Sequence, residues 1–406
     1  MKSVKVLYVS YDGILDPLGR SQIFPYIKQL SSRGVRYHLL TFEKKAALAN
    51  AESVSRLKKN MSELGIEWRP LRYHSRPLFF AKAIDILKMV WVSLHIVKKE
   101  DIRIIHARSY IAGLSAVIVK KIYKAAFLFD MRGFWIEERV DAGMWRGHNL
   151  FYNVAKEIEK LLFKSADHVI SLTKRAADKI MAIHYLSGRK DYISIIPTCV
   201  DLGLFTLSDP AKANMNKEVQ NLPTVFNLVY SGSVSTWSMP IQMLRFFTTL
   251  QEIIPQAHFL VLTPEKEFFD YIMKAENCHQ GAIHVFSAQY EALVHYLSFA
   301  KVGLAFYKKG ASHVARCPTK IGEYLACGLP VIINAGVGDT EELIKRERIG
   351  LILKDFSQPE YTRICHELKL LLSELDIRQR CRKVAEKYFS LKHGSDSYLS
   401  VYRRLM

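Results

Sequence analysis

Three polar residues stand at the start of a predicted helix in the last third of the chain. Thr319 and Lys320 occupy its first turn, and Glu323 lies one turn further on. The first turn of a helix has backbone N–H groups without intrahelical partners and the positive end of the helix dipole, so it attracts phosphate. Lys320 and the preceding Arg316 add positive charge there. We therefore predict a phosphate site in which the Glu323 carboxylate accepts a hydrogen bond from a sugar hydroxyl, although a capped helix with solvated side chains would show the same residues.

The neighbouring residues predict the elements that position this site. Pro318 suits the first helical position, N1, because its ring fixes φ and no N–H is needed there. Gly328 ends the helix, Pro330 cannot continue it, and a short buried strand follows at 331–333. This strand–turn–helix arrangement favours a ligand site over a solvated helix end.

The same stretch resembles the nucleotide-sugar site of the family 4 glycosyltransferases, which have the GT-B fold. The resemblance rests on Pro318-Thr319-Lys320, Glu323-Tyr324-Leu325-Ala326 and Gly328-Leu329-Pro330-Val331. It implies that Glu323 holds the donor ribose and that the helix start, with Thr319, Lys320 and Arg316, meets the diphosphate. The family has a second glutamate, which contacts the donor sugar, at the position of Ala315. The resemblance therefore does not identify the donor sugar.

Polar residues also follow three predicted strands in the first half of the chain, where the carboxyl ends of a doubly wound sheet border a ligand crevice. They are Gly19 and Arg20 after the strand at 4–10, His106, Arg108 and Tyr110 after the strand at 102–105, and Asp130 and Arg132 at the end of the strand at 127–130. The first segment resembles the family's first-domain loop near the donor phosphate, and the other two resemble its acceptor-side segments. The resemblance implies donor binding by Gly19 and Arg20 and acceptor contacts by Arg108 and Tyr110.

The catalytic helpers that the resemblance implies are His106, Asp130 and Arg132. A lone histidine is more often structural than catalytic. Asp130 and Arg132 also fit a salt bridge that shapes their loop. The residues alone leave these alternatives open.

The strand and helix pattern predicts an α/β protein with two Rossmann-like, doubly wound domains facing each other across a cleft, the GT-B fold. A second set of strands begins at 225–230, and the small residues Gly232 and Ser233 after it allow a ligand to approach the backbone closely. We place both residues at the donor. The predicted parts are an acceptor-binding domain at 1–205, a linker at 206–223, a nucleotide-sugar domain at 224–390 and a helix at 391–406 that crosses back to the first domain.

Composition indicates the number of domains, the state of the cysteines and the need for a metal or a cofactor. With 406 residues, 49% of them hydrophobic and 24% charged, the chain is long enough for two folded domains. Its six cysteines form no C-x-x-C pair, which predicts reduced thiols in the cytoplasm and no zinc site. No Asp-x-Asp pair occurs, so we expect no required metal and no cofactor. No apolar run is long enough for a signal peptide or a membrane span.

The net charge of +19 is concentrated in the first half of the chain. Residues 1–200 hold 34 Lys and Arg against 18 Asp and Glu, a balance of +16, whereas residues 201–406 hold 24 against 21, a balance of +3. An anionic membrane, an anionic acceptor or a nucleic acid would each match such a field, but no nucleic-acid motif accompanies it. Aromatic and basic residues alternate at 68–80, which suits lipid headgroups, and the helix at 79–99 fits either a core helix or a membrane-docking one.

These observations together predict a retaining glycosyltransferase. It would move a sugar from a nucleotide-diphosphate donor to a saccharide or lipid-linked acceptor in cell-surface polysaccharide synthesis, in the cytoplasm or on the inner face of the membrane. Two alternatives stay open. One is a sugar-nucleotide epimerase of the same fold, and the other is a binding subunit that kept the nucleotide site and lost catalysis.

Overall fold

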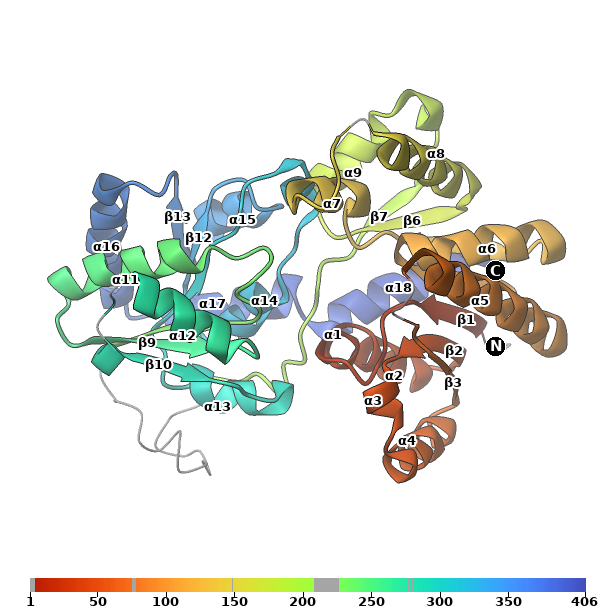
Figure 1. Ribbon diagram of the computed structural model, residues 1–406, viewed down its shortest axis with the longest axis horizontal. Coiled ribbons are helices and arrows are strands. Elements are labelled where there is room, and N and C mark those ends of the chain that lie inside the picture. The colour runs from red at the N-terminus through yellow and green to blue at the C-terminus, as the bar shows by residue number, and fades with distance from the viewer. Residues whose placement is uncertain (1–3, 75–77, 148, 208–225, 277, 279) are drawn as a thin grey trace. The chain divides into compact units, whose positions relative to one another are not determined.

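The computed structural model describes residues 4–74, 78–147, 149–207, 226–276, 278 and 280–406. The chain divides into two compact units (Figure 1). The first comprises Met1–Pro197 with Leu391–Met406, and the second comprises Thr198–Ser390. No described helix is both long enough and apolar enough to cross a membrane.

The first unit is built on a seven-stranded parallel sheet in the order β3-β2-β1-β4-β5-β6-β7. The strands are β1 Val4–Ser10, β2 Val35–Glu43, β3 Ile66–Arg72, β4 Ile104–Arg108, β5 Ala126–Asp130, β6 His168–Ser171 and β7 Ile193–Ile195. Its helices are α1 Pro17–Gln22, α2 Phe24–Ser31, α3 Lys45–Leu48, α4 Ala51–Glu63, α5 Leu78–Glu100, α6 Ser109–Tyr123, α7 Trp135–Asp141, α8 Leu150–Ser165, α9 Lys174–Met181 and α18 Leu391–Leu405, with a 3-10 turn η1 at His184–Leu186. The strand order reverses between β1 and β4, and ligands of such sheets bind at the carboxyl ends of strands at this point.

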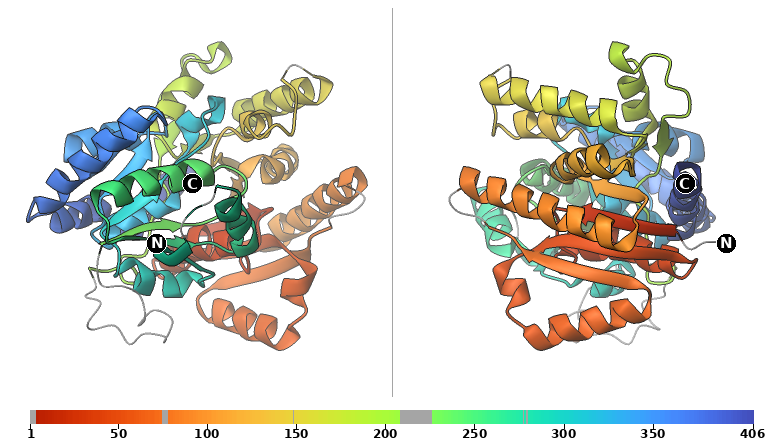
Figure 2. Two further views of the ribbon diagram at one scale, coloured as in Figure 1. Left: turned by 60° about the vertical axis from the view of Figure 1, so that its left-hand side comes forward. Right: turned by 90° about the vertical axis from the view of Figure 1, so that its right-hand side faces the viewer.

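Helices cover both faces of this sheet. Helices α5, α6 and α8 lie side by side, with α6 contacting both of the others (Figure 2). On the opposite face α18 packs beside α2, and its Tyr402 contacts Tyr37 of β2 and His106 of β4. The last helix of the chain is therefore part of the first unit.

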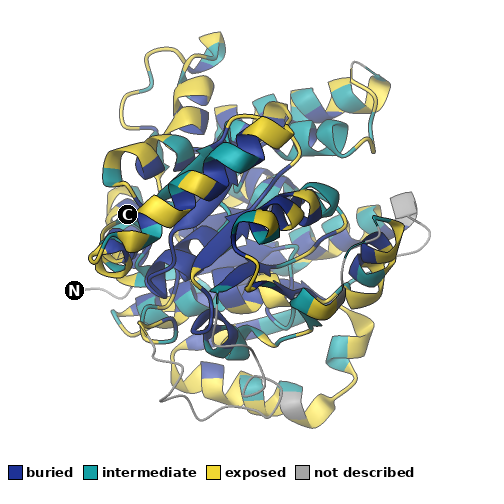
Figure 3. Cartoon of the chain, turned by 90° about the vertical axis from the view of Figure 1, so that its left-hand side faces the viewer, coloured by how far each residue is buried: buried dark blue, intermediate teal, exposed yellow. Residues whose placement is uncertain are grey.

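The second unit has a six-stranded parallel sheet in the order β10-β9-β8-β11-β12-β13. The strands are β8 Phe226–Ser231, β9 Ala257–Leu262, β10 Ile283–Phe286, β11 Val302–Ala305, β12 Val331–Asn334 and β13 Gly350–Leu353. Its helices are α11 Pro240–Ile253, α12 Lys266–Ala275, α13 Leu293–Leu297, α14 Thr319–Ala326, α15 Thr340–Glu347, α16 Gln358–Ser373 and α17 Ile377–Tyr388, with 3-10 turns η3 Gln280–Ala282, η4 Tyr290–Ala292 and η5 Ala311–Ala315. Figure 3 shows the buried strands between helices whose outer faces are exposed. The central strands β8, β9, β11 and β12 are buried almost throughout, which explains their largely apolar sequences, whereas the edge strands β10 and β13 are partly exposed.

Two details differ from the sequence-based expectations. The first unit ends at Pro197 rather than at residue 205, because Phe205 lies in the core of the second unit and Arg382 donates to its carbonyl oxygen at 2.6 Å. Pro318 is the N-cap of α14 rather than its first helical residue. Residues 208–225, most of the predicted linker, lie outside the described part of the chain.

Gly303 on β11 leaves room for the Tyr324 ring of α14. A Cβ atom at Gly303 would lie 2.1 Å from Cδ2 of Tyr324, so any larger residue must displace the ring. We expect Gly303→Ala to destabilise the second unit by about 1–3 kcal/mol. Thermal unfolding should show a Tm several degrees lower. Gly281→Ala in the same unit is the control, because nothing lies within 4 Å of a Cβ there. Equal Tm values for the two variants would contradict this packing.

Candidate active site

The turn after β8 approaches the start of α14 in the second unit. Gly232 has φ +119, in the region that favours glycine, and a Cβ there would lie 3.1 Å from Nζ of Lys320. The turn is fixed from below by Tyr324, whose hydroxyl accepts a hydrogen bond from the Ser231 N–H at 2.8 Å. Glycine is thus required at position 232 for two reasons: the backbone conformation favours it, and a larger side chain would come too close to Lys320.

Lys320 is held by aromatic rings instead of by an acidic partner. Its Nζ lies 3.8 Å from the centre of the Tyr230 ring and 5.6 Å from that of Tyr307. It forms no ion pair with any described carboxylate. Burial lowers the pKa of Lys320 to about 7, although the charge of Glu323 opposes the shift. A proton on this amine is therefore easily gained or lost near neutral pH.

Arg316 lies in the same aromatic cluster. Its guanidinium carbon is 4.4 Å from the centre of the Trp237 ring and 5.4 Å from that of Tyr307. Cation–π contacts of this kind fix a cation without cancelling its charge. Arg316 and Lys320 therefore bring two positive charges to one place beside the Gly232 turn.

Glu323 is buried one turn into α14. Burial raises its pKa to about 7, and the positive charge of Lys320 limits the rise. No described group donates a hydrogen bond to its carboxylate. Thr319 begins the same helix, half-buried. A carboxylate in this position is available to a hydroxyl-bearing ligand.

Glu265, just after β9, holds the loop that follows Gly232. Its carboxylate accepts hydrogen bonds from the backbone N–H groups of Val234 at 2.7 Å and Ser235 at 3.0 Å, and from the hydroxyls of Ser233 and Ser235. Burial opposes the charged form, but these bonds outweigh it and lower the pKa of Glu265. The Ser233 hydroxyl, predicted to bind the donor, is thus bonded to Glu265 in this structure.

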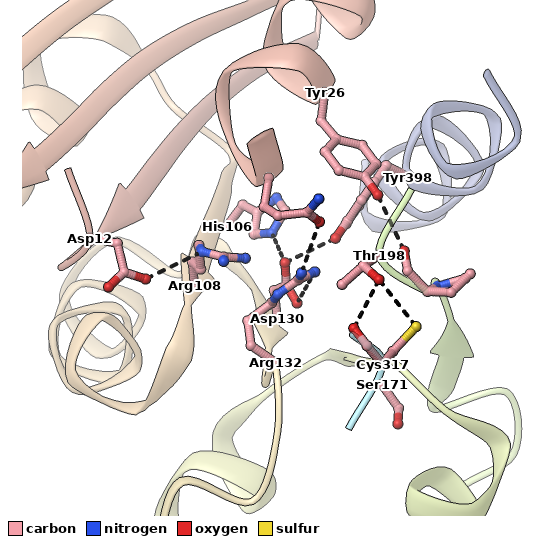
Figure 4. A network of polar contacts seen from close by, with 12 residues as sticks. Asp12, Tyr26, His106, Arg108, Asp130, Arg132, Ser171, Thr198, Cys317 and Tyr398 are labelled. Atoms are coloured by element: carbon pink, nitrogen blue, oxygen red, sulfur yellow. Dashed lines mark hydrogen bonds and ion pairs between the residues drawn. The ribbon is translucent and has the colours of Figure 1, made fainter. Parts of the chain in front are cut away.

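The first unit has a second polar cluster at the carboxyl ends of β4 and β5 (Figure 4). His106 is 2% exposed, with Nδ1 2.7 Å from the Tyr402 hydroxyl and Nε2 3.4 Å from Oδ2 of Asp130. The Tyr398 hydroxyl donates to the same Asp130 oxygen at 2.9 Å. Both tyrosines come from α18, so the end of the chain completes this cluster.

Burial and neighbouring charges set the protonation of this pair. Burial lowers the pKa of His106, so the imidazole is neutral at neutral pH. Burial opposes the charge of Asp130, but the Arg132 guanidinium and the His106 ring outweigh it and lower its pKa to about 2. The pair is a neutral imidazole beside a permanent carboxylate, with both ring nitrogens already engaged.

Two arginines complete the cluster. Nη1 of Arg132 lies 3.7 Å from Oδ1 of Asp130, and Nε of Arg108 lies 3.5 Å from Oδ2 of Asp12. Tyr110 is engaged elsewhere, since its buried hydroxyl donates to Glu159 of α8 at 2.7 Å.

The loop after β1 carries the predicted donor residues of the first unit. A Cβ at Gly19 would lie 2.0 Å from the Gly13 carbonyl oxygen, so the loop requires glycine there. Arg20 is exposed on α1. The buried Glu43 carboxylate accepts hydrogen bonds from the N–H groups of Ile14 at 2.8 Å and Leu15 at 3.2 Å. Glu43 thereby holds the loop after β1, as Glu265 holds the loop after β8 in the second unit.

The structure thus brings the predicted residues into two groups, each within one unit. The second unit gathers Gly232, Ser233, Arg316, Thr319, Lys320 and Glu323, and the first gathers His106, Arg108, Asp130 and Arg132. Sequence reasoning missed Glu43, Glu265, Tyr398 and Tyr402. The acids do have a sequence signal, because Glu43 ends the apolar run of β2 and Glu265 stands shortly after that of β9. The tyrosines have only the i, i+4 spacing of an ordinary packed helix.

Comparisons with known proteins agree with this architecture. Residues 24–204 match Glycosyltransferase Family 4. No curated protein sequence matches the chain. A glycosyltransferase from Rickettsia africae ESF-5 has a TM-score of 0.70 at 15% identity, covering 100% of this chain and 99% of that one.

Two further solved structures resemble the chain over nearly its full length. Sucrose-phosphate synthase from Thermosynechococcus elongatus has a TM-score of 0.70 at 16% identity, covering 99% of each chain. Anabaena Alr3699/HepE in complex with UDP and glucose has a TM-score of 0.67 at 13% identity, covering 98% of this chain and 99% of that one. At these identities the likeness shows the fold, and the predicted pair of Rossmann-like GT-B domains is confirmed.

Glu265→Gln tests the role of this carboxylate in holding the loop. Because a neutral amide accepts hydrogen bonds less strongly than a carboxylate, we expect the amides of Val234 and Ser235 to exchange hydrogen about tenfold faster. Amide exchange followed by mass spectrometry is the measurement. Glu267→Gln, an exposed acid at the start of α12, is the control and should leave the loop unchanged. Unaltered exchange in Glu265→Gln would mean that other contacts hold the loop.

Proposed function

We propose that the chain transfers a sugar from a nucleotide-diphosphate donor, with retention, to a lipid-linked or saccharide acceptor, because residues 24–204 match Glycosyltransferase Family 4 and the chain has the GT-B fold. The observation that carries this proposal is the cluster of Lys320, Arg316 and Glu323 beside the Gly232 turn. The process we assign is cell-surface polysaccharide synthesis on the cytoplasmic face of the membrane.

The donor site follows from the charges of the second unit. Sugar transfer separates charge, because the diphosphate leaves with negative charge while the anomeric carbon becomes positive. Lys320, Arg316 and the N-terminus of α14 would stabilise the departing phosphate oxygens. Glu323 would accept hydrogen bonds from the ribose hydroxyls and so orient the donor. UDP is the first nucleotide to test, because the Anabaena neighbour holds it.

The reaction we propose needs neither an enzyme nucleophile nor a bound metal. In a retaining transfer of this kind the acceptor hydroxyl attacks from the face that the diphosphate leaves, and the leaving phosphate takes the acceptor's proton. We assign His106 and Asp130 to positioning rather than proton transfer, because His106 is buried with both nitrogens engaged. We also assign Gly19 and Arg20 to the donor phosphates.

An epimerase of the same fold, or a binding subunit without catalysis, would share the nucleotide site. The distinguishing observation is transfer, since only a glycosyltransferase consumes donor in proportion to acceptor.

The membrane location is supported by an exposed apolar surface on the first unit, which we call the docking face. It comprises Ile84, Leu87 and Trp91 of α5, Ile118 and Ile122 of α6, and Leu150, Phe151 and Val154 of α8, all at least 40% exposed. These three helices lie side by side. Exposed lysines, including Lys88, Lys98 and Lys121, alternate with the apolar residues. Apolar side chains among lysines, in the half of the chain with a charge of +16, suit an anionic lipid surface.

The docking face replaces the predicted headgroup contact at 68–80. Trp68 is 5% exposed and donates to the Thr41 hydroxyl at 2.8 Å, so this ring belongs to the core. Residues 75–77, including Arg76, lie outside the described residues. For α5, which fitted either a core helix or a docking helix, the exposed Trp91 favours docking.

The donor site is tested by titrating UDP into the full chain between pH 6.5 and 8.5. Free Lys320 loses its proton near pH 7, and a bound diphosphate raises its pKa again. Binding above pH 7 therefore requires proton uptake, and affinity should fall as pH rises, by up to about tenfold per pH unit. Lys320→Arg should show a smaller decline, because only Glu323 of this pair then titrates in the range, and Lys320→Met should bind at least about tenfold more weakly at pH 7. A wild-type affinity that does not change with pH would contradict the role of Lys320.

The docking face is tested by co-sedimentation with vesicles of phosphatidylglycerol and phosphatidylcholine. We expect Leu87→Ser combined with Trp91→Ser to reduce the bound fraction several-fold, because both exposed side chains would lose their insertion into the bilayer. Tyr271→Ser, at a 70% exposed aromatic of the second unit, is the matched control and should sediment as wild type does. Equal sedimentation of all three proteins would rule out docking through α5.

A further inference from the structure

Arg108 has a buried guanidinium that donates no hydrogen bond to any described residue. Its side chain is 3% exposed, and Nε and Nη1 are fully covered yet have no hydrogen-bond partner. The nearest carboxylate oxygen, Oδ2 of Asp12, is 3.5 Å from Nε, and that side chain is 45% exposed. A buried charge in this state is costly unless something completes its hydrogen bonds.

A second guanidinium, that of Arg132, lies at the neighbouring strand end (Figure 4). Arg132 has φ +63, a left-handed conformation that is unfavourable for a residue with a side chain. Its side chain is 12% exposed, with Nη1 3.7 Å from Oδ1 of Asp130. The backbone thus holds a strained shape that keeps Arg132 beside this carboxylate.

The buried charges of the cluster do not cancel. Arg108 and Arg132 carry two positive charges, and Asp130 carries one negative charge. The Asp130 carboxylate also contacts the Tyr398 hydroxyl and the His106 ring. His106 is neutral. Asp12 forms an ion pair with Arg108 at 3.5 Å, but its side chain is 45% exposed, so its charge is not one of the buried charges. One buried positive charge is therefore in excess.

We propose that Arg108 and Arg132 form an oxyanion subsite for the acceptor, which rests on the glycosyltransferase function proposed above. A guanidinium presents paired N–H donors that match the oxygens of a phosphate or a carboxylate. The acceptor is accordingly anionic near its reacting hydroxyl. The oxyanion is either the phosphate of a lipid carrier or the carboxylate of a uronic acid.

The position of Arg108 favours the lipid phosphate. Helix α6 begins at Ser109, directly after Arg108, and lies between α5 and α8. These helices carry the docking face. A carrier lipid whose chain lies at this face and whose phosphate reaches the start of α6 would meet both features at once.

The test measures binding of four probes to the full chain by calorimetry. Farnesyl monophosphate and methyl glucuronide present the two oxyanions, and farnesol and methyl glucoside are their uncharged counterparts. We expect wild type to bind farnesyl monophosphate and not farnesol, and Arg108→Gln to weaken that binding at least tenfold. Binding of methyl glucuronide alone would assign the subsite to a uronic acid. Binding of neither anion by wild type would overturn the proposal.

Controls separate this proposal from a structural role and from the donor site. Arg103→Gln, at the opposite end of β4 and 69% exposed, should bind as wild type does. Arg108→Lys keeps the charge and should retain part of the binding. We expect Arg108→Gln to unfold at the same or a higher temperature, because the excess charge is gone. A large fall in Tm would instead make Arg108 structural and overturn the proposal.

UDP titrations distinguish a failure of the oxyanion subsite from a failure of the proposed donor site. Unchanged UDP affinity in Arg108→Gln, with lost phosphate binding, supports an acceptor subsite. A weakened UDP affinity would assign Arg108 to the donor diphosphate and overturn the proposal. A wild-type protein that binds farnesyl monophosphate but no UDP would contradict the proposed donor and leave the oxyanion subsite standing.

Discussion

The buried Tyr324 side chain is the contact on which the second unit's site depends. Its ring occupies the space that Gly303 leaves on β11, and its hydroxyl accepts the Ser231 N–H at the end of β8. One residue thus fixes the distance between the β8 turn and α14. Because Lys320 and Glu323 belong to the same helix, their positions relative to the Gly232 turn follow from this contact. The placement of the Lys320 and Glu323 charges at the site therefore depends on how α14 packs against the sheet.

In both units a buried or partly buried glutamate holds the loop after the first strand. A carboxylate from the neighbouring strand or just beyond it accepts two successive backbone N–H groups, Glu43 in the first unit and Glu265 in the second. Such a bond needs no second charged partner, because the amide dipoles stabilise the anion. In both loops the carboxylate bonds the backbone directly, and in the second unit Lys320 and Arg316 lie against aromatic rings.

Prediction from sequence worked where the signal is local. Thr319, Lys320 and Glu323 stand within one helix whose start and end are marked by Pro318 and Gly328, and the structure brings them to the predicted turn. Contacts between residues far apart in the sequence could not be predicted. Tyr402 lies 296 residues from the histidine that it contacts, and nothing in its helix indicates that partner. The boundary at residue 205 failed for a related reason, since Phe205 belongs to the core formed by later residues.

The discontinuity of the first unit has a consequence for biosynthesis. Its sheet is encoded before residue 198, but the tyrosines that close over His106 and Asp130 come from Leu391–Leu405. Domains tend to fold during translation as soon as their residues emerge from the ribosome. The first unit cannot complete its fold before residues 391–405 have been made, because Tyr398 and Tyr402 supply the contacts to Asp130 and His106. A nascent chain that ends between Ser390 and Leu391 would thus hold all residues of the second unit but lack one helix of the first.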